Sequence, residues 1–243
     1  QWRINGAKEF ITNSGTDITS LVTVTAVTGT VEGRTGHDGR PAKEISTILV
    51  PAGTEGFSVA KAYDKVGWNS SDTHALHFSD VRVPEENLLG ARGRGFAHFL
   101  EILDEGRIAI AALATGAAQG CVDESVAYAK QRTSFGQKIG QFQAVSFKIA
   151  RMQARAHAAR LAYYEAAQKM LAGKPFKTEA AMAKLIAGEA AMDNARDATQ
   201  VFGGYGFMNE TLVARHYRDS KILEVGEGTT EVQLMLIARE LGL

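Results

Sequence analysis

The sequence contains little cysteine and little proline, and neither sign of charge is in excess. Cys121 is the only cysteine, which excludes an internal disulfide and is typical of a reducing compartment, where a lone thiol packs as a small buried group. Lys plus Arg and Asp plus Glu number 27 each, so no net charge would attract nucleic acid or an acidic membrane. No run of about 18 apolar residues is present, so the sequence predicts no transmembrane segment.

Signals for a metal site and for a leader are also missing. His74 and His77 are three residues apart in an expected strand and would point to opposite faces, so they cannot jointly bind zinc. The chain begins without methionine and without a charged stretch followed by an apolar one, so no targeting segment is visible. Trp2–Ile4, Asn5-Gly6 and Ala7–Thr12 read as a two-residue hairpin. A chain that opens on a hairpin is expected to lack its beginning.

The pattern of apolar residues changes near residue 92. Residues 1–92 contain short β-branched or aromatic runs between turn residues, which predicts an antiparallel β-sheet or open barrel. The predicted strands are Phe10–Thr12, Leu21–Val27, Ile45–Val50, Phe57–Ala60, Ala75–Phe78 and Val81–Val83. The glycine-rich link from Thr28 to Lys43 is expected to be a mobile surface loop without a chemical role.

In residues 93–243 apolar and small residues recur at steps of three and four, which predicts long helices that meet along a seam. Similar steps link Ile108 to Ala129 and Leu185 to Phe202, and the longest seam contains Phe142, Val145, Ile149, Met152, Ala156, Ala159, Tyr163, Ala166 and Met170. Their small side chains imply closely approaching helices, and a shorter helix over Thr230–Leu241 completes the set. The expected fold is therefore α+β, with a β-domain over residues 1–92 and a four-helix bundle over residues 93–243.

Glu227 is a single carboxylate between Gly226 and Gly228, just before a helix start in which Thr230 and Gln233 have the spacing of a capping box. The glycines permit unusual backbone conformations and close approach of a ligand, while the helix N-terminus supplies free N–H groups and positive potential. Such a carboxylate can serve as a base. The alternative is a solvated glutamate in a flexible loop, and the local pattern by itself favours that alternative.

Two further patterns lie at helix junctions. Arg132-Thr133-Ser134-Phe135-Gly136 ends one predicted helix and Phe142-Gln143 opens the next, so an arginine, a hydroxyl and loop amides are placed to bind a pyrophosphate. Gln200-Val201-Phe202-Gly203-Gly204-Tyr205-Gly206 closes another helix, and its glycines would either cap that helix or let a flat or phosphorylated ligand contact the main chain. The glycines of residues 90–95 follow no strand of a βαβ unit, so they are not a dinucleotide fingerprint.

Five stretches carry a family resemblance in their order and spacing. They are Lys8–Asn13 (KEFITN), Val81–Gly90 (VRVPEENLLG), Arg132–Gly136 (RTSFG), Gln200–Gly206 (QVFGGYG) and Glu227–Gln233 (EGTTEVQ). Together they resemble the acyl-CoA dehydrogenases over essentially the whole chain. The resemblance implies a middle β-domain and a C-terminal four-helix bundle that bind FAD, a homotetramer or dimer, and a flavin that accepts electrons from an acyl-CoA thioester in β-oxidation.

The resemblance also implies roles for single residues. Glu227 matches the catalytic base, which removes the proton α to the thioester carbonyl while hydride moves from the β-carbon to flavin N5. Phe10 matches the aromatic residue that packs on the isoalloxazine, and Thr12 matches the hydroxyl that reaches the ring near N5. The other matches to FAD-binding positions are Arg132, Ser134, Phe135, Gln143, Gln200, Gly203, Gly204, Thr229 and Glu231.

Some members of this family take their base from the residue before the arginine of a motif that here reads Leu103-Asp104-Glu105-Gly106-Arg107. This chain has Gly106 at that position and Glu227 at the usual one, so the resemblance assigns the base to Glu227. Asp104 and Arg107 match positions that contact CoA or order the loop beneath it, and Gly228 is a further expected substrate-binding position. The alternative for Asp104 and Arg107 is a buried ion pair that fixes the helix start.

The sequence departs from the family in its length. It lacks a further N-terminal helical domain of roughly one hundred residues, so the chain is expected to be a fragment of a longer enzyme or a truncated chain that cannot retain FAD. Three functions stay open: a dehydrogenase that passes electrons to an electron-transfer flavoprotein, an acyl-CoA oxidase that passes them to oxygen, and a non-catalytic scaffold subunit. The expected compartment is a bacterial cytoplasm or a mitochondrial matrix, and the acyl chain length is not readable.

Overall fold

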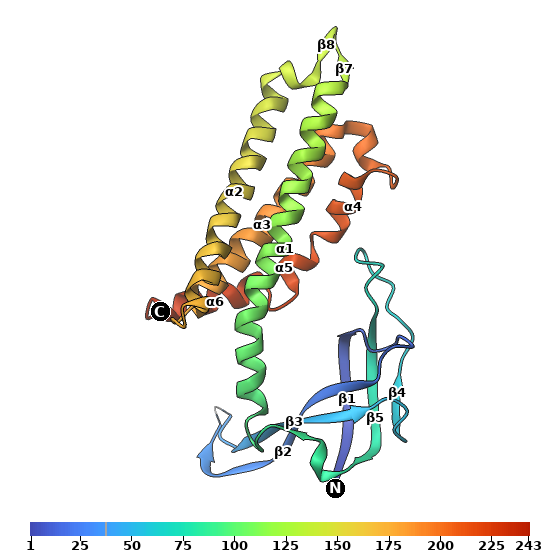
Figure 1. Cartoon of the computed structure of the whole chain (residues 1–243), viewed down its shortest axis with the longest axis vertical. Coiled ribbons are helices and arrows are strands. Elements are labelled where there is room, and N and C mark those ends of the chain that lie inside the picture. Colours follow the sequence, from blue (N-terminus) through green and yellow to red (C-terminus); the bar gives the residue numbers. More distant parts are fainter. Residues whose placement is uncertain (37) are drawn as a thin grey trace. The chain divides into compact units, whose positions relative to one another are not determined.

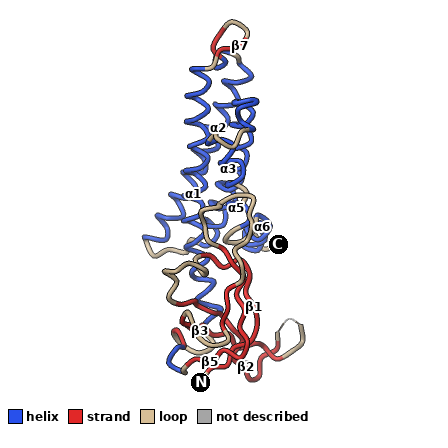
Figure 2. Tube along the Cα trace, turned by 90° about the vertical axis from the view of Figure 1, so that its right-hand side faces the viewer, coloured by secondary structure: helices blue, strands red, loops and turns tan. Residues whose placement is uncertain are grey.

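The structure, a computed structural model, describes residues 1–36 and 38–243 and divides into two compact units, Gln1–Ile102 and Leu103–Leu243 (Figure 1). Strands, drawn red in Figure 2, dominate the first unit, and helices, drawn blue, dominate the second. The predicted α+β class with an antiparallel β-part followed by helices is confirmed. The predicted domain boundary after residue 92 stays a prediction, because the division between the compact units falls inside a helix that begins at Gly95.

Two three-stranded antiparallel sheets build the first unit, in the orders β1-β5-β4 and β2-β3-β6. Their strands are β1 (Trp2–Thr12), β2 (Leu21–Thr35), β3 (Pro41–Pro51), β4 (Phe57–Val59), β5 (Thr73–Val83) and β6 (Leu88–Leu89). Alternate residues of both sheets point into one core, for example Val22 and Val24, Ile48 and Val50, and Leu76 and Phe78. Strands therefore form where the sequence has its β-branched and aromatic runs, and alternate residues of these strands build the core.

The predicted hairpin at Asn5-Gly6 is wrong. β1 runs straight through these residues and pairs along its length with β5, with Ile4 opposite Val81 and an irregularity in register between Ile4 and Gly6. The side chain of Asn5 accepts a hydrogen bond from the backbone N–H of Asp80 at 2.8 Å, and Gly6 takes a φ of 144°. An Asn-Gly pair suits a strand irregularity as well as a turn, and long-range pairing decided between them.

The bounds of two other predicted elements in the first unit differ from those in the structure. Most of the link from Thr28 to Lys43, predicted as a loop, is strand, because β2 continues to Thr35 and β3 begins at Pro41. The runs Ala75–Phe78 and Val81–Val83 belong to one strand, β5. His37, within the predicted loop, lies outside the described residues.

Three long helices dominate the second unit (Figure 1). Its elements are α1 (Gly95–Gln131, which begins in the first unit), β7 (Thr133–Ser134), β8 (Gln137–Lys138), α2 (Gln143–Leu171), α3 (Lys177–Phe202), α4 (Leu212–Asp219), α5 (Ile222–Val225) and α6 (Thr230–Glu240). Met152, Ala156, Ala159 and Ala166 of the predicted seam are the buried residues of α2. The sequence analysis missed the short helices α4 and α5 and the β7–β8 hairpin.

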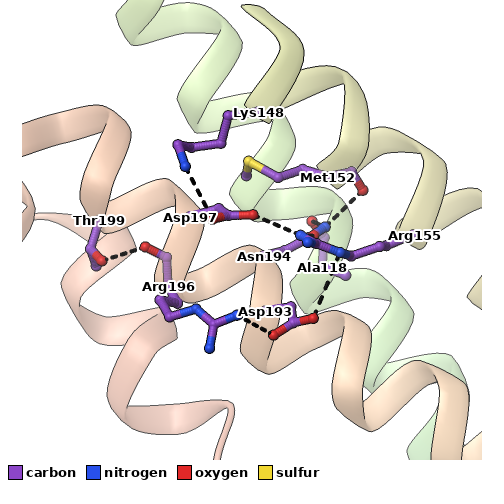
Figure 3. Close-up of polar contacts among 9 residues, drawn as sticks. All are labelled: Ala118, Lys148, Met152, Arg155, Asp193, Asn194, Arg196, Asp197 and Thr199. Carbon is purple, nitrogen blue, oxygen red and sulfur yellow. Dashed lines mark hydrogen bonds and ion pairs between the residues drawn. The ribbon is translucent and has the colours of Figure 1, made fainter. Parts of the chain in front are cut away.

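Asn194 connects three helices of this unit (Figure 3). Its buried side chain in α3 donates hydrogen bonds to the carbonyl of Ala118 in α1 at 3.1 Å and to the carbonyl of Met152 in α2 at 2.9 Å. Its amide oxygen accepts a hydrogen bond from Arg155 of α2, whose guanidinium also contacts Asp197 at 2.7 Å. The amide nitrogen and the amide oxygen are both paired, so this one side chain fixes the register of three helices.

Replacement of Asn194 by leucine should destabilise the helical unit. The change keeps a similar volume but removes both donors and leaves Arg155 without one acceptor, so we expect a loss of about 1–3 kcal/mol in the free energy of unfolding. Chemical denaturation followed by circular dichroism measures it. The matched control is Arg196→Gln on the same helix, where an exposed side chain loses its ion pair with Asp193 and a change below about 0.5 kcal/mol is expected. Equal effects of the two changes would contradict the assigned role of Asn194.

The start of α1 lies directly against β3 within the first unit. A Cβ atom on Gly95 would lie 2.5 Å from the carbonyl carbon of Ser46 and 2.7 Å from its Cα. The buried hydroxyl of Ser46 accepts a hydrogen bond from the backbone N–H of Gly93 at 2.9 Å, so the chain is attached to the sheet just before the helix begins. Only glycine fits at position 95.

Alanine substitutions at two glycines of α1 should have opposite effects on stability. Gly95→Ala would push the helix start off β3 and cost about 1–3 kcal/mol. Gly116→Ala, in the same helix with nothing within 4 Å of the added Cβ, should stabilise by about 0.5–1 kcal/mol, because alanine suits a helix interior better. Thermal unfolding of both variants gives the comparison, and a neutral Gly95→Ala would refute the close approach.

Candidate functional site

Glu227 lies in a left-handed stretch of backbone between α5 and α6. Its φ is 54°, unusual for a residue with a side chain, and Gly228 follows at 94°. The carboxylate-bearing side chain is exposed, and the backbone N–H of Glu227 makes no hydrogen bond within the part of the chain that the structure describes. A strained residue with a free N–H and an exposed carboxylate is an arrangement often found at functional sites.

The cap of α6 differs from the predicted capping box. The N-cap is Thr229, one residue earlier than expected, and its hydroxyl accepts a hydrogen bond from the backbone N–H of Val232 at 3.4 Å. Gln233 turns inward instead of reaching back to the cap, and it donates to the carbonyls of Gly228 at 2.9 Å and of Glu227 at 3.4 Å. The backbone N–H of Glu231 itself and, to a smaller extent, the Thr229 hydroxyl lower the pKa of the Glu231 carboxyl. Thr230–Gln233 as a capping box is therefore wrong, because burial draws Gln233 inward.

The Glu227 side chain lies over Gly106 of α1, in the same unit. A Cβ on Gly106 would lie 2.8 Å from Oε2 of Glu227. A side chain at position 106 would therefore require the carboxylate to move from this place. This contact brings together positions 106 and 227, the two positions from which members of the family that the sequence resembles take their base.

Asp104 and Arg107 are one turn apart on α1 and form an ion pair. Arg107 is buried, and its Nε has no hydrogen-bond partner among the described residues. Because α1 begins at Gly95, the pair lies well inside the helix, and the alternative that it fixes the helix start is wrong. Glu105 also lies within α1.

Lys184 of α3 contacts the Glu227 loop from the inside and was missed by sequence reasoning. Its side chain is 1% exposed, and its Nζ donates to the carbonyl of Glu224 at 2.8 Å and to that of Gly228 at 2.6 Å. Burial lowers the pKa of the Lys184 ammonium to about 8. A signal was available: Lys184 falls on the face of a helix whose other members Ala180, Ala181 and Ala187 are fully buried.

A cleft of about 490 Å³ lies at the other two patterns singled out in the sequence. It is lined by Tyr128, Arg132, Ser134, Ile139, Val201, Phe202, Gly203, Gly204, Tyr205 and Met208. The structure thus brings Arg132 and Ser134 of the β7–β8 hairpin together with Gly203 and Gly204 at the end of α3. No atoms lie within 4 Å of a Cβ built on either glycine, so the main chain is accessible there.

Other predicted residues lie outside that cleft. Phe135, Gln143 and Gln200 do not line it, and Phe135 is 95% exposed at the tip of the β7–β8 hairpin. Tyr128 was missed, although it lies in the last turn of α1 and its carbonyl accepts a hydrogen bond from the backbone N–H of Arg132 at 2.8 Å. Its ring stacks on Phe202 with centroids 4.1 Å apart, which fixes one wall of the cleft.

Phe10 and Thr12 belong to the first unit. Phe10 is 74% exposed with a φ of 60°, and its ring lies 5.3 Å from that of Tyr63. Thr12 is exposed at the end of β1, opposite Thr73 of β5. The exposed aromatic face and the nearby hydroxyl could contact a flat ligand.

Within residues 1–36 and 38–243, no cluster of three or more His, Cys, Asp or Glu side chains could bind a metal. No described helix is long and apolar enough to cross a membrane.

Comparison with known proteins gives consistent matches along the chain. The acyl-CoA dehydrogenase middle-domain model matches residues 1–81, and the acyl-CoA dehydrogenase C-terminal-domain model matches residues 93–242. The short-chain specific acyl-CoA dehydrogenase of Megasphaera elsdenii is 44% identical over 235 residues, which are 97% of this chain and 59% of that protein.

Solved structures agree with these matches. Butyryl-CoA dehydrogenase from Megasphaera elsdenii has a TM-score of 0.90 at 43% identity, covering 99% of this chain and 60% of that one. An FAD complex of PigA has a TM-score of 0.90 at 31% identity, covering all of this chain and 61% of that one. The chain thus spans about three fifths of the length of the relatives it matches. With a family model over most of its length and a relative at this identity, the chain belongs to the acyl-CoA dehydrogenase family.

Proposed function

We propose that this chain carries the catalytic base and part of the cofactor site of an FAD-dependent acyl-CoA dehydrogenase. The Glu227 loop is the observation that carries the proposal. Its left-handed backbone presents an exposed carboxylate and a free N–H side by side, and Gly106 leaves the space that the carboxylate occupies. A base and a hydrogen-bond donor in one residue suit proton removal next to a carbonyl.

Glu227 would remove the proton from the carbon α to the thioester carbonyl. Its backbone N–H would donate to the thioester oxygen, which acidifies that proton by stabilising the developing negative charge. The electron pair of the broken C–H bond forms the new double bond while a hydride leaves the β-carbon. FAD, when bound, supplies the two-electron acceptor for that hydride.

The cleft between the β7–β8 hairpin and the end of α3 fits the diphosphate and adenosine parts of FAD. Arg132 makes no ion pair within the described ranges, so its guanidinium is available for phosphate, and Ser134, Gly203 and Gly204 offer a hydroxyl and accessible amides beside it. The remaining candidates are Phe135, Gln143, Gln200, Thr229 and Glu231, with Phe10 and Thr12 for the isoalloxazine. The FAD complex of a similar protein supports this choice of cofactor.

We assign a short acyl-CoA as substrate, because the similar proteins are named short-chain specific acyl-CoA dehydrogenase and butyryl-CoA dehydrogenase. Gly228 would lie beside the substrate as the neighbour of Glu227. Arg107 is buried and paired with Asp104, so we assign this pair to ordering α1 next to Glu227 rather than to direct contact with CoA.

Exposed apolar side chains on the helical unit support assembly into a homotetramer or dimer. Phe147, Leu161 and Leu171 of α2 are 60%, 56% and 82% exposed, and contact with other copies of the chain would bury such side chains. An electron-transfer flavoprotein is the proposed acceptor of the electrons. Hydrogen peroxide release in the absence of that partner would instead indicate an acyl-CoA oxidase.

Glu227→Gln should abolish turnover and leave the cofactor bound. The amide keeps the shape of the side chain but cannot accept the α-proton, so we expect kcat of the full-length protein with butyryl-CoA to fall by about 10²–10⁴-fold. Flavin absorbance measures the bound FAD, and its bleaching measures turnover. Glu105→Gln is the matched control, since Glu105 is an exposed acid adjacent to Gly106. A Glu227→Gln protein with wild-type turnover would indicate another base or a scaffold role.

Arg132→Ala should weaken FAD retention. The change removes the guanidinium from the cleft, and loss of a charge-assisted phosphate contact typically costs about 1.5–3 kcal/mol, or roughly 10–150-fold in the FAD dissociation constant. Titration of the deflavinated full-length protein with FAD measures it. Arg151→Ala, an exposed arginine of α2 outside the cleft, is the control and should bind FAD as the wild type does.

A further inference from the structure

Two buried side chains bond the main chain of the Glu227 loop. Lys184 and Gln233, here called the loop clamp, are 1% and 0% exposed, and both donate to the carbonyl of Gly228, at 2.6 Å and 2.9 Å. Lys184 also donates to the carbonyl of Glu224 at 2.8 Å, three residues before the base. One ammonium therefore joins the two ends of the turn that contains Glu227.

The left-handed backbone at Glu227 has to be held in place by its surroundings. A residue with a side chain at a φ of 54° costs roughly 1–3 kcal/mol and persists only where its surroundings enforce it. Helix α3 packs tightly against the segment before the loop. A Cβ on Gly188, one turn from Lys184 in α3, would lie 2.8 Å from the carbonyl oxygen of Leu223. Helix α3 thus approaches the backbone of α5 closely, and Lys184 extends the same face toward the loop.

A buried ammonium group is an unusual donor to main-chain carbonyls. Its ammonium forms no ion pair within 4 Å among the described residues, and its contacts are neutral carbonyls. The charged groups around it are Glu224 of α5, Glu227 of the loop and Glu231 of α6, whose carboxylates stabilise the ammonium, and Arg107 of α1, which opposes it. A neutral donor could bond the same carbonyls at a smaller desolvation cost, so the charge itself has a use.

We propose that the loop clamp, with Lys184 as its main member, is a positioning device that holds Glu227 in its left-handed turn and places a positive charge behind the catalytic carboxylate. The proposal rests on the proposed role of Glu227. Lys184 acts through the loop and does not contact the substrate.

Lys184→Met tests the device in the full-length FAD-loaded protein. Methionine fills a similar volume without donors or charge, and misplacement of a base by about 1 Å can cost 10²-fold in rate, so we expect kcat with butyryl-CoA to fall about 10²-fold while KM changes little. Lys169→Met is the matched control, because Lys169 is a partly exposed lysine ion-paired with Glu179 between α2 and α3. Its kcat should equal that of the wild type.

The pH profile separates positioning from general structural support. Burial lowers the pKa of Lys184 to about 8, so the ammonium is present below that pH and is lost as pH rises through it. The neutral amine keeps N–H donors, but its hydrogen bonds are weaker without the charge. The kcat of the wild type should therefore decline above about pH 8, and this decline should be absent in Lys184→Met.

Hydrogen exchange gives a readout that does not depend on activity. In Lys184→Met the peptides covering residues 224–229 should exchange about tenfold faster, while those covering residues 108–122 of α1 are unchanged. If Lys184→Met does not fold, Gln233→Met takes its place, with the same faster exchange and a smaller loss of kcat.

These experiments distinguish failure of the loop clamp proposal from failure of the proposed function. If the wild type does not bleach with acyl-CoA, or Glu227→Gln turns over normally, the role of Glu227 is refuted whatever the exchange data show. If the wild type and Glu227→Gln behave as proposed, then unchanged kcat, pH profile and exchange in the folded clamp variant overturn the clamp. Faster exchange with unchanged kcat and pH profile also overturns it, because the contact would then be structural only.

Discussion

The close approach of α3 to its neighbours is the constraint on which the helical unit depends. Alanine at most of its buried positions keeps the helices near enough for side chains to bond main-chain carbonyls of other elements. Asn194 does so toward α1 and α2, and Lys184 does so toward α5 and the Glu227 loop. Larger residues on this face would separate the elements and break both sets of contacts. The packing of one helix thus orders the bundle and the candidate active site together.

Polar groups inside this unit differ in how completely they are satisfied. The amide of Asn194 has partners for its nitrogen and its oxygen, as expected of a group that fixes structure. Around Glu227 the balance is different: Nε of Arg107 and Oε1 of Gln233 lack partners among the described residues, and Lys184 is a buried charge on neutral carbonyls. Incompletely satisfied polar groups together with a left-handed residue are features that proteins retain at functional sites, and they support the role proposed for Glu227.

Much of the fold could be predicted because burial imposes a period on the sequence. Short β-branched or aromatic runs identified the strands, and steps of three and four identified the long helices and a seam that includes the buried Met152, Ala156, Ala159 and Ala166. Predictions were wrong where a local sequence pattern is compatible with two structures. Asn5-Gly6 suits a turn or a strand irregularity, and pairing with β5 selected the second. The short helices α4 and α5 contain too few residues for a period to show.

The sequence by itself determined which chemical groups are available: one glutamate between glycines, an arginine and a serine after a helix, and paired glycines after another. Their types and order were sufficient for the family resemblance. Only the tertiary structure decided which of them meet. It placed Arg132 and Ser134 beside Gly203 and Gly204, laid Glu227 over Gly106, and revealed Lys184 beneath the loop. The reason is physical: a lone lysine in a helix reads as a solvated charge until packing shows that it is buried and which carbonyls it binds.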